Sequence, residues 1–221
     1  MGRTATYLDI AQRSDEWFAL RCGKLTGSRA KDMLAAIRSG ESAARRDLRV
    51  QLCVERLTGT PYDSGEGFVN AAMQWGIDTE AEARHAYEAL TGQTVWDGGF
   101  IEHATHRAGH SPDGIVGDGA GLLEIKCPLS ATHLGYLRSG ELPTRHLAQL
   151  RHGLWVAGRQ PDDPQWIDFF SYDPRFPDGL QTFLRRLTLE EADLDTYDHA
   201  ATAFLCEVDD ELDAIHALKV A

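Results

Sequence analysis

A short segment in the middle of the chain, residues 113–127, constrains the fold most. Ile115-Val116 and Leu122–Cys127 are rich in β-branched and aliphatic residues, and a glycine-rich run, Gly117-Asp118-Gly119, separates them. Two such stretches joined by a glycine-rich turn are typical of a β-hairpin. Pro128 follows directly and ends the second strand. The segment therefore predicts two antiparallel strands within a larger sheet.

Helical periodicity and capping residues predict the elements on either side of this hairpin. The expected helices cover about 15–21, 28–37, 43–58, 73–90, 142–158 and 188–219, and a further strand covers 165–172. This order indicates an α/β (α+β) fold with a central mixed sheet flanked by helices and a long C-terminal helix. No repeat or Pro/Ser-rich linker divides the chain. We expect one domain, 1–221, with an N-terminal helical part of about 1–92 and an acidic C-terminal helix of about 188–221.

The charge is distributed unevenly along the 221 residues. The net charge of −12 by itself argues against nucleic acid as a partner. Residues 1–60, however, hold 11 Lys/Arg and 7 Asp/Glu, whereas residues 188–221 hold 10 acids and one base. An acidic protein with a locally positive groove can still bind DNA. For the acidic end alone, we expect a solubilising surface.

Asp113, Glu124 and Lys126 are the candidate catalytic residues. Residues two apart on a strand point to the same face, so Glu124 and Lys126 project together while Ile125 faces the core. Asp113, near the start of the preceding strand, reaches the same point across the hairpin. Carboxylates suit Mg²⁺, and the Ile125 carbonyl is a plausible further ligand. The lysine can orient or deprotonate the attacking water.

An ordinary Glu–Lys pair on an exposed strand is the competing interpretation. Such pairs are common on protein surfaces, and the spacing alone produces false matches. The strand is apolar around the pair, at Leu122, Leu123 and Ile125, and Pro112-Asp113-Gly114 precedes it at hairpin distance. Both features favour a site.

The motif Asp113…Glu124-x-Lys126 resembles the PD-(D/E)xK nuclease pattern. The surrounding SPDG…LLEIKCP resembles the phage lambda exonuclease (YqaJ-like viral recombinase) branch of those nucleases. Further matches to this family occur in the same order along the chain, between about residues 16 and 174. They are Glu16-Trp17-x4-Arg21-x-Gly23-x2-Thr26-x-Ser28, Gly76-x3-Glu80 and Ala148-Gln149-Leu150. The resemblance implies a restriction-endonuclease-like core.

The resemblance also implies roles for the acidic residues. Asp113 and Glu124 would bind Mg²⁺, with Mn²⁺ as a substitute and two ions per site, and Lys126 would handle the attacking water. Glu80 would be an outer ligand or an anchor for Lys126. The alternative for Glu80 is a solvated helix carboxylate paired with Arg84, one turn later.

A second set of residues matches positions that this family uses to hold a terminal 5′-phosphate. A guanidinium, two hydroxyls and an amide supply donors to a dianion. The set consists of Arg21, Ser28, Ser111 and Gln149. Each alone has an ordinary alternative, such as Ser28 capping its helix. Arg38 is a candidate for guiding the DNA end. Met73 is either an apolar wedge against the end base pair or, as we favour, a helix packing residue.

Three histidines, His103, His106 and His110, lie within eight residues. No cysteine or acid stands at the spacing that a zinc site needs, and the stretch looks extended rather than helical. We therefore interpret it as an exposed loop near the cleft.

The four cysteines are widely spaced, without a C-x-x-C pair, and no apolar run approaches the ~20 residues that span a bilayer. Reduced cysteines fit the cytoplasm, and the resemblance implies a bacterial cell with a phage or prophage origin. No membrane partner is expected. The cysteines are Cys22, Cys53, Cys127 and Cys206.

The expected function is a 5′→3′ exonuclease. The resemblance implies digestion of linear duplex DNA from 5′-phosphorylated ends to mononucleotides, leaving 3′ overhangs for single-strand annealing recombination. The expected partners are duplex ends, further copies of the chain in a homotrimer, and a single-strand annealing protein. A structure-specific or nicking endonuclease is the alternative, since fold does not fix substrate. A non-catalytic DNA-end or scaffold protein is disfavoured by the intact catalytic residues.

Overall fold

The predicted hairpin forms the centre of a five-stranded sheet. Strands β6 (Gly114–Val116) and β7 (Gly121–Lys126) are antiparallel, with Ile115 opposite Leu122. The turn between them holds Gly117 at φ +61° and Gly119 at φ +100°, conformations that favour glycine. These data come from a computed structural model, which describes residues 4–62 and 71–218 and leaves out the side chains of 71–73.

Three more strands complete this sheet, in the order β3-β6-β7-β8-β9. β8 (Trp166–Tyr172), predicted at 165–172, pairs parallel with β7, while β3 (Val95–Trp96) and β9 (Thr182–Thr188) pair antiparallel at the edges. The central mixed sheet is therefore confirmed.

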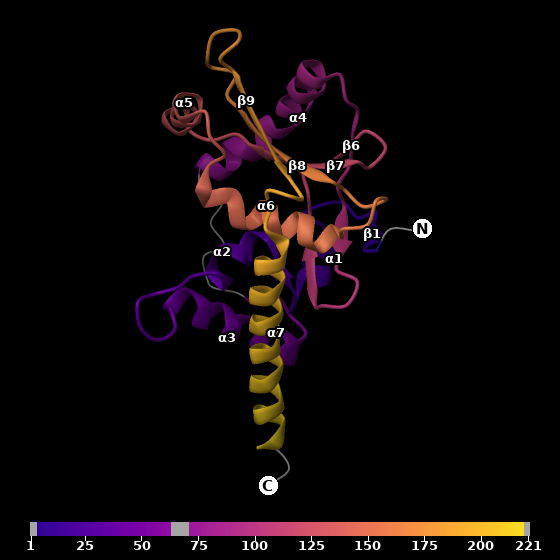
Figure 1. Cartoon of the computed structure of the whole chain (residues 1–221), viewed down its shortest axis with the longest axis vertical. Helices are drawn as coiled ribbons and strands as arrows, with labels where there is room; N and C mark the ends of the chain where they lie inside the picture. The colour runs from indigo at the N-terminus through magenta and orange to yellow at the C-terminus, as the bar shows by residue number, and fades with distance from the viewer. Residues whose placement is uncertain (1–3, 63–70, 219–221) are drawn as a thin grey trace.

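The parallel β7–β8 pair requires a crossover, which two helices provide. α5 (Ser130–Ser139) was not predicted, whereas α6 (Thr144–Ala157) matches the helix expected at 142–158. α6 buries Leu150 and Leu154 against one face of the sheet. On the other face lies α4 (Ala71–Thr91), expected at 73–90. The sheet is thus flanked by helices on both faces (Figure 1).

A second, four-stranded sheet was not predicted. Its order is β1-β4-β5-β2, made of β1 (Thr6–Leu8), β4 (Phe100–Glu102), β5 (Ala108–His110) and β2 (Leu25–Thr26). β2 and β5 pair in parallel although more than 80 residues separate them in the chain. This sheet joins the N-terminal segment to the region that leads into β6.

The N-terminal helices follow their capping residues. α1 (Asp15–Arg21) begins at Ser14, whose Oγ accepts from the Trp17 N–H at 3.2 Å. α3 (Ala43–Thr58), expected at 43–58, ends at Gly59 in the left-handed conformation. The helix expected at 28–37 is shorter: a 3₁₀ turn leads into α2 (Ala30–Met33).

The reason for the short α2 lies in the segment after it. The Ser42 hydroxyl donates to the Ala35 carbonyl at 2.9 Å, and Ala36 pairs with Glu41 in an isolated bridge. These contacts turn the chain back before a helix to residue 37 can form.

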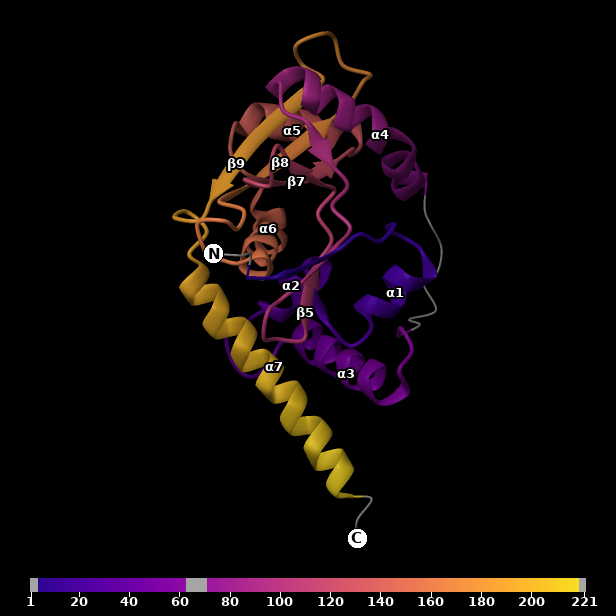
Figure 2. The same cartoon turned by 90° about the vertical axis from the view of Figure 1, so that its right-hand side faces the viewer.

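The C-terminal helix α7 (Leu194–Ala217) is long, as predicted, but starts six residues later than expected. The residues up to Thr188 extend β9, and Glu191 accepts from the Thr188 hydroxyl in the turn that follows. Figure 2 shows α7 running alongside α3. Within the described ranges, no helix is long and apolar enough to cross a membrane.

Pairing between α3 and α7 explains the uneven charge along the sequence. Basic residues of the N-terminal region and acids of the C-terminal helix lie against each other. The pairs are Arg45 with Glu207, Arg49 with Glu211 and Arg56 with Asp209, at 2.6–2.8 Å. The acidic end therefore does more than provide the solubilising surface that we expected, because these three acids, which remain 36–63% exposed, also pair with α3.

Candidate functional site

Strand β7 carries two of the predicted catalytic residues on one face. Alternation along the strand turns Leu122, Glu124 and Lys126 towards α6, whereas Ile125 packs on the α4 side of the sheet. The Lys126 ammonium forms an ion pair with Glu124. The Gln149 amide of α6 donates to the same carboxylate oxygen at 2.5 Å. The predicted common face of Glu124 and Lys126 is present.

Asp113 reaches this point across the hairpin, as expected. Its Oδ2 accepts from the Ile125 N–H at 2.6 Å. Burial and the neighbouring Glu124 and Glu80 carboxylates raise the pKa of Asp113 to about 8. Two acids held this close repel each other when both are ionised, so the site favours a cation between them.

Glu124 gives a second indication of a cation site. The residue is 1% exposed, and its Oε2 is buried with no hydrogen-bond partner among the described residues. A buried, unsatisfied carboxylate oxygen is costly unless a ligand completes it. Two carboxylates and a nearby main-chain carbonyl fit Mg²⁺, which keeps several waters. Within the described chain, no three His, Cys, Asp or Glu side chains form a complete metal site by themselves.

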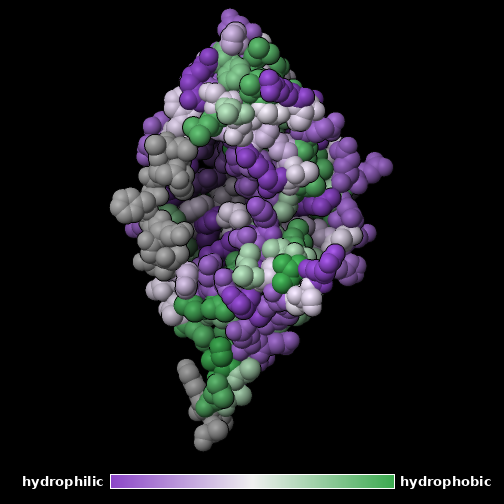
Figure 3. Space-filling model, turned by 90° about the vertical axis from the view of Figure 1, so that its left-hand side faces the viewer, coloured by the Kyte–Doolittle hydropathy of each residue, from purple (hydrophilic) through white to green (hydrophobic). Residues whose placement is uncertain are grey.

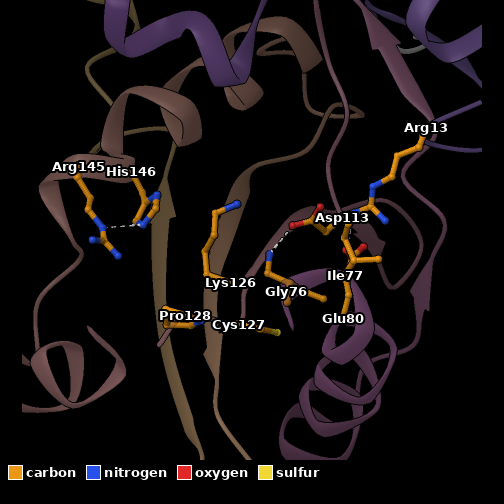
Figure 4. A pocket seen from close by; sticks show the side chains of 11 residues that line it. Arg13, Gly76, Ile77, Glu80, Asp113, Lys126, Cys127, Pro128, Arg145 and His146 are labelled. Atoms are coloured by element: carbon orange, nitrogen blue, oxygen red, sulfur yellow. Dashed lines mark hydrogen bonds and ion pairs between the residues drawn. The ribbon is translucent and has the colours of Figure 1, made fainter. Parts of the chain in front are cut away.

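Glu80 lines the same cavity as Asp113 and Lys126 (Figure 4). The alternative of a pair with Arg84 is not seen, because Arg84 pairs with Asp97 at 2.5 Å. Glu80 pairs instead with Arg13 at 3.0 Å. Sequence reasoning missed Arg13, which lies two residues before α1 and outside every motif that we recognised.

The opposite wall of the cavity carries an arginine and a histidine, and burial lowers the pKa of the histidine, His146, to about 4. Arg145 and His146, at the start of α6, face Lys126 in Figure 4. Burial disfavours the Lys126 ammonium, but the Glu124 and Asp113 carboxylates outweigh burial, and the pKa of Lys126 is raised. Figure 3 shows that the side of the molecule where α4 and α6 begin is hollowed and mostly hydrophilic. Arg145 and His146 were also missed, although they lie just before the motif containing Gln149.

The predicted phosphate-binding residues lie beside this centre. Arg21 Nη2 donates to the Ser28 hydroxyl at 3.2 Å, and its guanidinium stacks on Trp17 at 4.1 Å. The Trp17 indole in turn donates to the Ser111 hydroxyl at 2.7 Å. Burial, and then the nearby Arg29, lower the pKa of Arg21 to about 10. An anion would stabilise a guanidinium held in such surroundings.

Gln149 links these residues to the acidic centre. Its side-chain amide donates to Glu124. Its Cγ packs near Gly27, because a Cβ placed on that glycine would lie 3.4 Å from it. Because Gly27 precedes Ser28, the four predicted phosphate-binding residues form one neighbourhood. Arg38 does not join them: it is exposed in the loop between Ala36 and Glu41. The Met73 side chain lies outside the described residues.

The histidine segment differs from the exposed loop that we expected. His110 lies on β5 and is 1% exposed, and His103 and His106 are half-buried, stacked on Trp155. A Cβ on Gly153 of α6 would lie 2.8 Å from His110 Nε2, so glycine is required there. The segment packs β5 against α6 instead of lining the cleft.

Comparison with known proteins gives the family. Residues 16–160 match the YqaJ-like viral recombinase domain. The chain belongs to this family. The YqaJ-like chain is similar to LHK-Exo, an alkaline exonuclease from Laribacter hongkongensis, at 37% identity and a TM-score of 0.80. The match covers 94% of this chain and 100% of LHK-Exo, and another crystal structure of LHK-Exo, matched equally well, contains dAMP.

A phage-related exonuclease from Haemophilus somnus 129PT shares the fold. It is 13% identical with a TM-score of 0.62, and the match covers 87% of this chain and 96% of that one. No curated protein matches the sequence. Taken with the family, the alkaline exonuclease relatives show that the YqaJ-like chain is a nuclease.

Proposed function

We propose that the protein is a magnesium-dependent exonuclease that degrades one strand of linear duplex DNA in the 5′→3′ direction. It would start at 5′-phosphorylated ends, release mononucleotides and leave 3′ overhangs for single-strand annealing recombination. The observation that carries this proposal is the unsatisfied buried oxygen of Glu124, beside Asp113 and Lys126 and next to the Arg21 pocket.

Asp113, Glu124 and the Ile125 carbonyl are the residues that would hold Mg²⁺ or Mn²⁺, with Glu80 as an outer ligand and two ions per site as part of the proposal. The bound metal supplies Lewis-acid polarisation of the scissile phosphate. Asp113 and Glu124 fix the position of the metal-binding oxygens relative to β7. The Ile125 N–H holds one Asp113 oxygen in place and leaves the other free to bind.

Lys126 supplies a positive charge next to the reacting phosphate. Its pairing with Glu124 keeps it protonated, so it acts as a donor that orients the attacking water and stabilises the charge that develops on the phosphate. Gln149 donates to the same Glu124 oxygen as Lys126 and thereby restricts the rotamer of the Glu124 side chain.

The pocket of Arg21, Ser28, Ser111 and Gln149 supports action at a DNA end. An internal phosphodiester carries one negative charge, whereas a terminal phosphate is dianionic and gains more from a guanidinium fork. LHK-Exo, which contains dAMP in one crystal structure, binds a deoxynucleoside monophosphate, the class of product that such an enzyme releases. A homotrimer, a single-strand annealing partner and a cytoplasmic location are part of the same proposal.

The experiment compares linear duplex with covalently closed circular duplex, in Mg²⁺ and in EDTA, with the products separated by size. Mononucleotides from the linear substrate, intact circles and no reaction in EDTA are the expected results. Rapid nicking of the closed circles would instead support an endonuclease on the same core. Full activity in EDTA would exclude the metal-dependent site.

A further inference from the structure

Arg13 has an unusual backbone conformation for its residue type. Its φ is +69°, and only Asp193 shares a positive φ among the non-glycine residues that the structure describes. Side chains with a Cβ are disfavoured in this region, and such residues are concentrated at binding and catalytic sites. The unfavourable backbone conformation of Arg13 therefore suggests that an interaction of its side chain compensates the cost.

The side chain of Arg13 reaches the reaction centre from outside. Its guanidinium pairs with Glu80 at 3.0 Å, and Arg13 lines three cavities that also include Asp113 and Glu80. The Arg13 side chain is 51% exposed, so the charge remains accessible. Arg84 borders two of these cavities too, but it donates to Asp97 and to the Val95 carbonyl at 2.5 Å each. Of these two arginines, Arg13 is therefore the one that can leave its partner, Glu80, and bind another anion.

Helix α1 fixes where Arg13 lies relative to the terminal-phosphate pocket. Arg13 precedes the seven-residue helix, and Arg21 is its last residue. A helix of this length spans about 10 Å. Trp17, halfway along, contacts Ser111, two residues before Asp113. The two arginines therefore lie at opposite ends of α1, and the Asp113 centre lies towards the Arg13 end, because Gln12 donates to the Pro112 carbonyl at 2.8 Å.

This spacing matches a DNA strand better than a single phosphate. Successive base pairs rise by about 3.4 Å along the duplex axis, and phosphates of one strand also separate around that axis, so two cations about 10 Å apart meet different phosphates of one strand. If Arg21 holds the terminal phosphate and Asp113 lies near the scissile one, Arg13 lies beside the phosphates that follow. Glu80 and Asp113 would repel a polyanion there unless a cation faces it, and Arg13 supplies that cation.

We propose that Arg13 leaves Glu80 when DNA binds. Its guanidinium then contacts the first or second backbone phosphate on the 3′ side of the scissile bond. The proposal rests on the proposed exonuclease function, because that function defines which strand end occupies the Arg21 pocket. Arg13 and Arg21 together would hold the cleaved strand on both sides of the reacting phosphate.

The test compares wild type with Arg13→Gly and Arg13→Lys. Glycine removes the guanidinium and also relieves the positive φ, so a loss of function in this variant does not come from backbone strain. Arg46→Gln is the matched control, since Arg46 is exposed on α3 and, among the described residues, pairs with its neighbour Asp47. Circular dichroism and thermal melts of all four proteins check the fold.

Two measurements separate DNA binding from support of Glu80. The first is the salt dependence of binding to a linear duplex in EDTA, where loss of one phosphate contact lowers the log–log slope by about 1. The second is the cleavage rate on duplexes with one neutral methylphosphonate at the first, second or third phosphate after the scissile bond. A fall of about tenfold in wild type, about 1.4 kcal/mol, is expected at the first or second position and is absent in Arg13→Gly.

Arg13→Lys should keep the salt slope of wild type, because it keeps the charge. An unchanged slope in Arg13→Gly, together with methylphosphonate effects equal to those of wild type, would overturn the proposal and leave Arg13 only as a support for Glu80. The outcome is distinct from failure of the proposed function. A wild type that digests no linear duplex refutes the exonuclease, whereas the binding slopes judge Arg13 without any cleavage.

Discussion

Replacement of Arg21 by alanine is the sharpest test of the proposed preference for 5′-phosphorylated DNA ends. In the free protein the Arg21 guanidinium donates only to hydroxyls, Ser28 at 3.2 Å and Thr26 at 3.5 Å, among its described hydrogen-bond partners. Burial and Arg29 lower its pKa to about 10. Both observations describe a cation without a matched anion, and a terminal phosphate dianion would supply one.

The size of the expected effect follows from these contacts. A hydrogen bond to a charged group contributes about 1.5–3 kcal/mol, and a factor of ten corresponds to about 1.4 kcal/mol. Arg21 is only half-buried, so solvent screening places the expected preference near the lower limit of this interval, on the order of tenfold. Arg21→Ala should erase most of it, and Arg21→Lys should keep part, because lysine keeps the charge but loses the planar fork.

The assay is the initial digestion rate on linear duplex with 5′-phosphate or 5′-hydroxyl ends, for wild type and both variants. Arg46→Gln again controls for loss of a positive charge elsewhere on the surface. Equal rates on the two ends in wild type would refute the reasoning. A preference that persists in Arg21→Ala would show that other donors recognise the phosphate.

Three further predictions follow from the site and its supports. Glu124→Gln and Lys126→Ala should each lower cleavage by at least about a hundredfold while duplex binding in EDTA persists; a rate near wild type in either variant would contradict the site. Burial lowers the pKa of His152 to about 4 from its ordinary 6.5, so its contribution to stability is complete above about pH 6.5 and is lost as the pH falls towards 4. We expect the urea-unfolding free energy to drop between pH 7 and pH 4 by on the order of 3 kcal/mol from this residue, and a flat profile would refute the assignment. Arg49→Gln, which removes the pairs with Glu41, Glu207 and Glu211, should cost about 1 kcal/mol at low salt and less in 1 M NaCl; equal losses at both salt concentrations would argue against an ionic contribution.

Local signals in the sequence predicted much of the fold. Ser14 and Gly59 mark helix ends through contacts within a few residues, and the glycines between β6 and β7 fix the turn through their own conformations. The strand alternation that places Glu124 and Lys126 on one face is equally local. These features depend on neighbouring residues, so the sequence displays them directly.

Features that depend on distant segments could not be predicted in this way. β2 and β5 are two and three residues long, and their pairing is visible only after the chain has folded. β9 was missed because Arg185 and Arg186 interrupt its apolar pattern with exposed positions. Arg13 finds its partner Glu80 67 positions away, and no spacing rule connects the two. The catalytic and phosphate-binding roles of the predicted residues stay predictions.

The crossover between β7 and β8 also determines when the site can assemble as the chain is synthesised. The β6–β7 hairpin brings Asp113 to Ile125 over 12 positions and closes a short loop, which costs little entropy and is fast. Gln149 on α6 and the parallel strand β8 come later in the chain, and β7 is an exposed edge until they arrive. Parallel pairing over such a separation is slow. An emerging polypeptide therefore holds the hairpin long before it holds a hydrolytic cavity, and an unfinished chain has no enclosed centre with which to cut DNA.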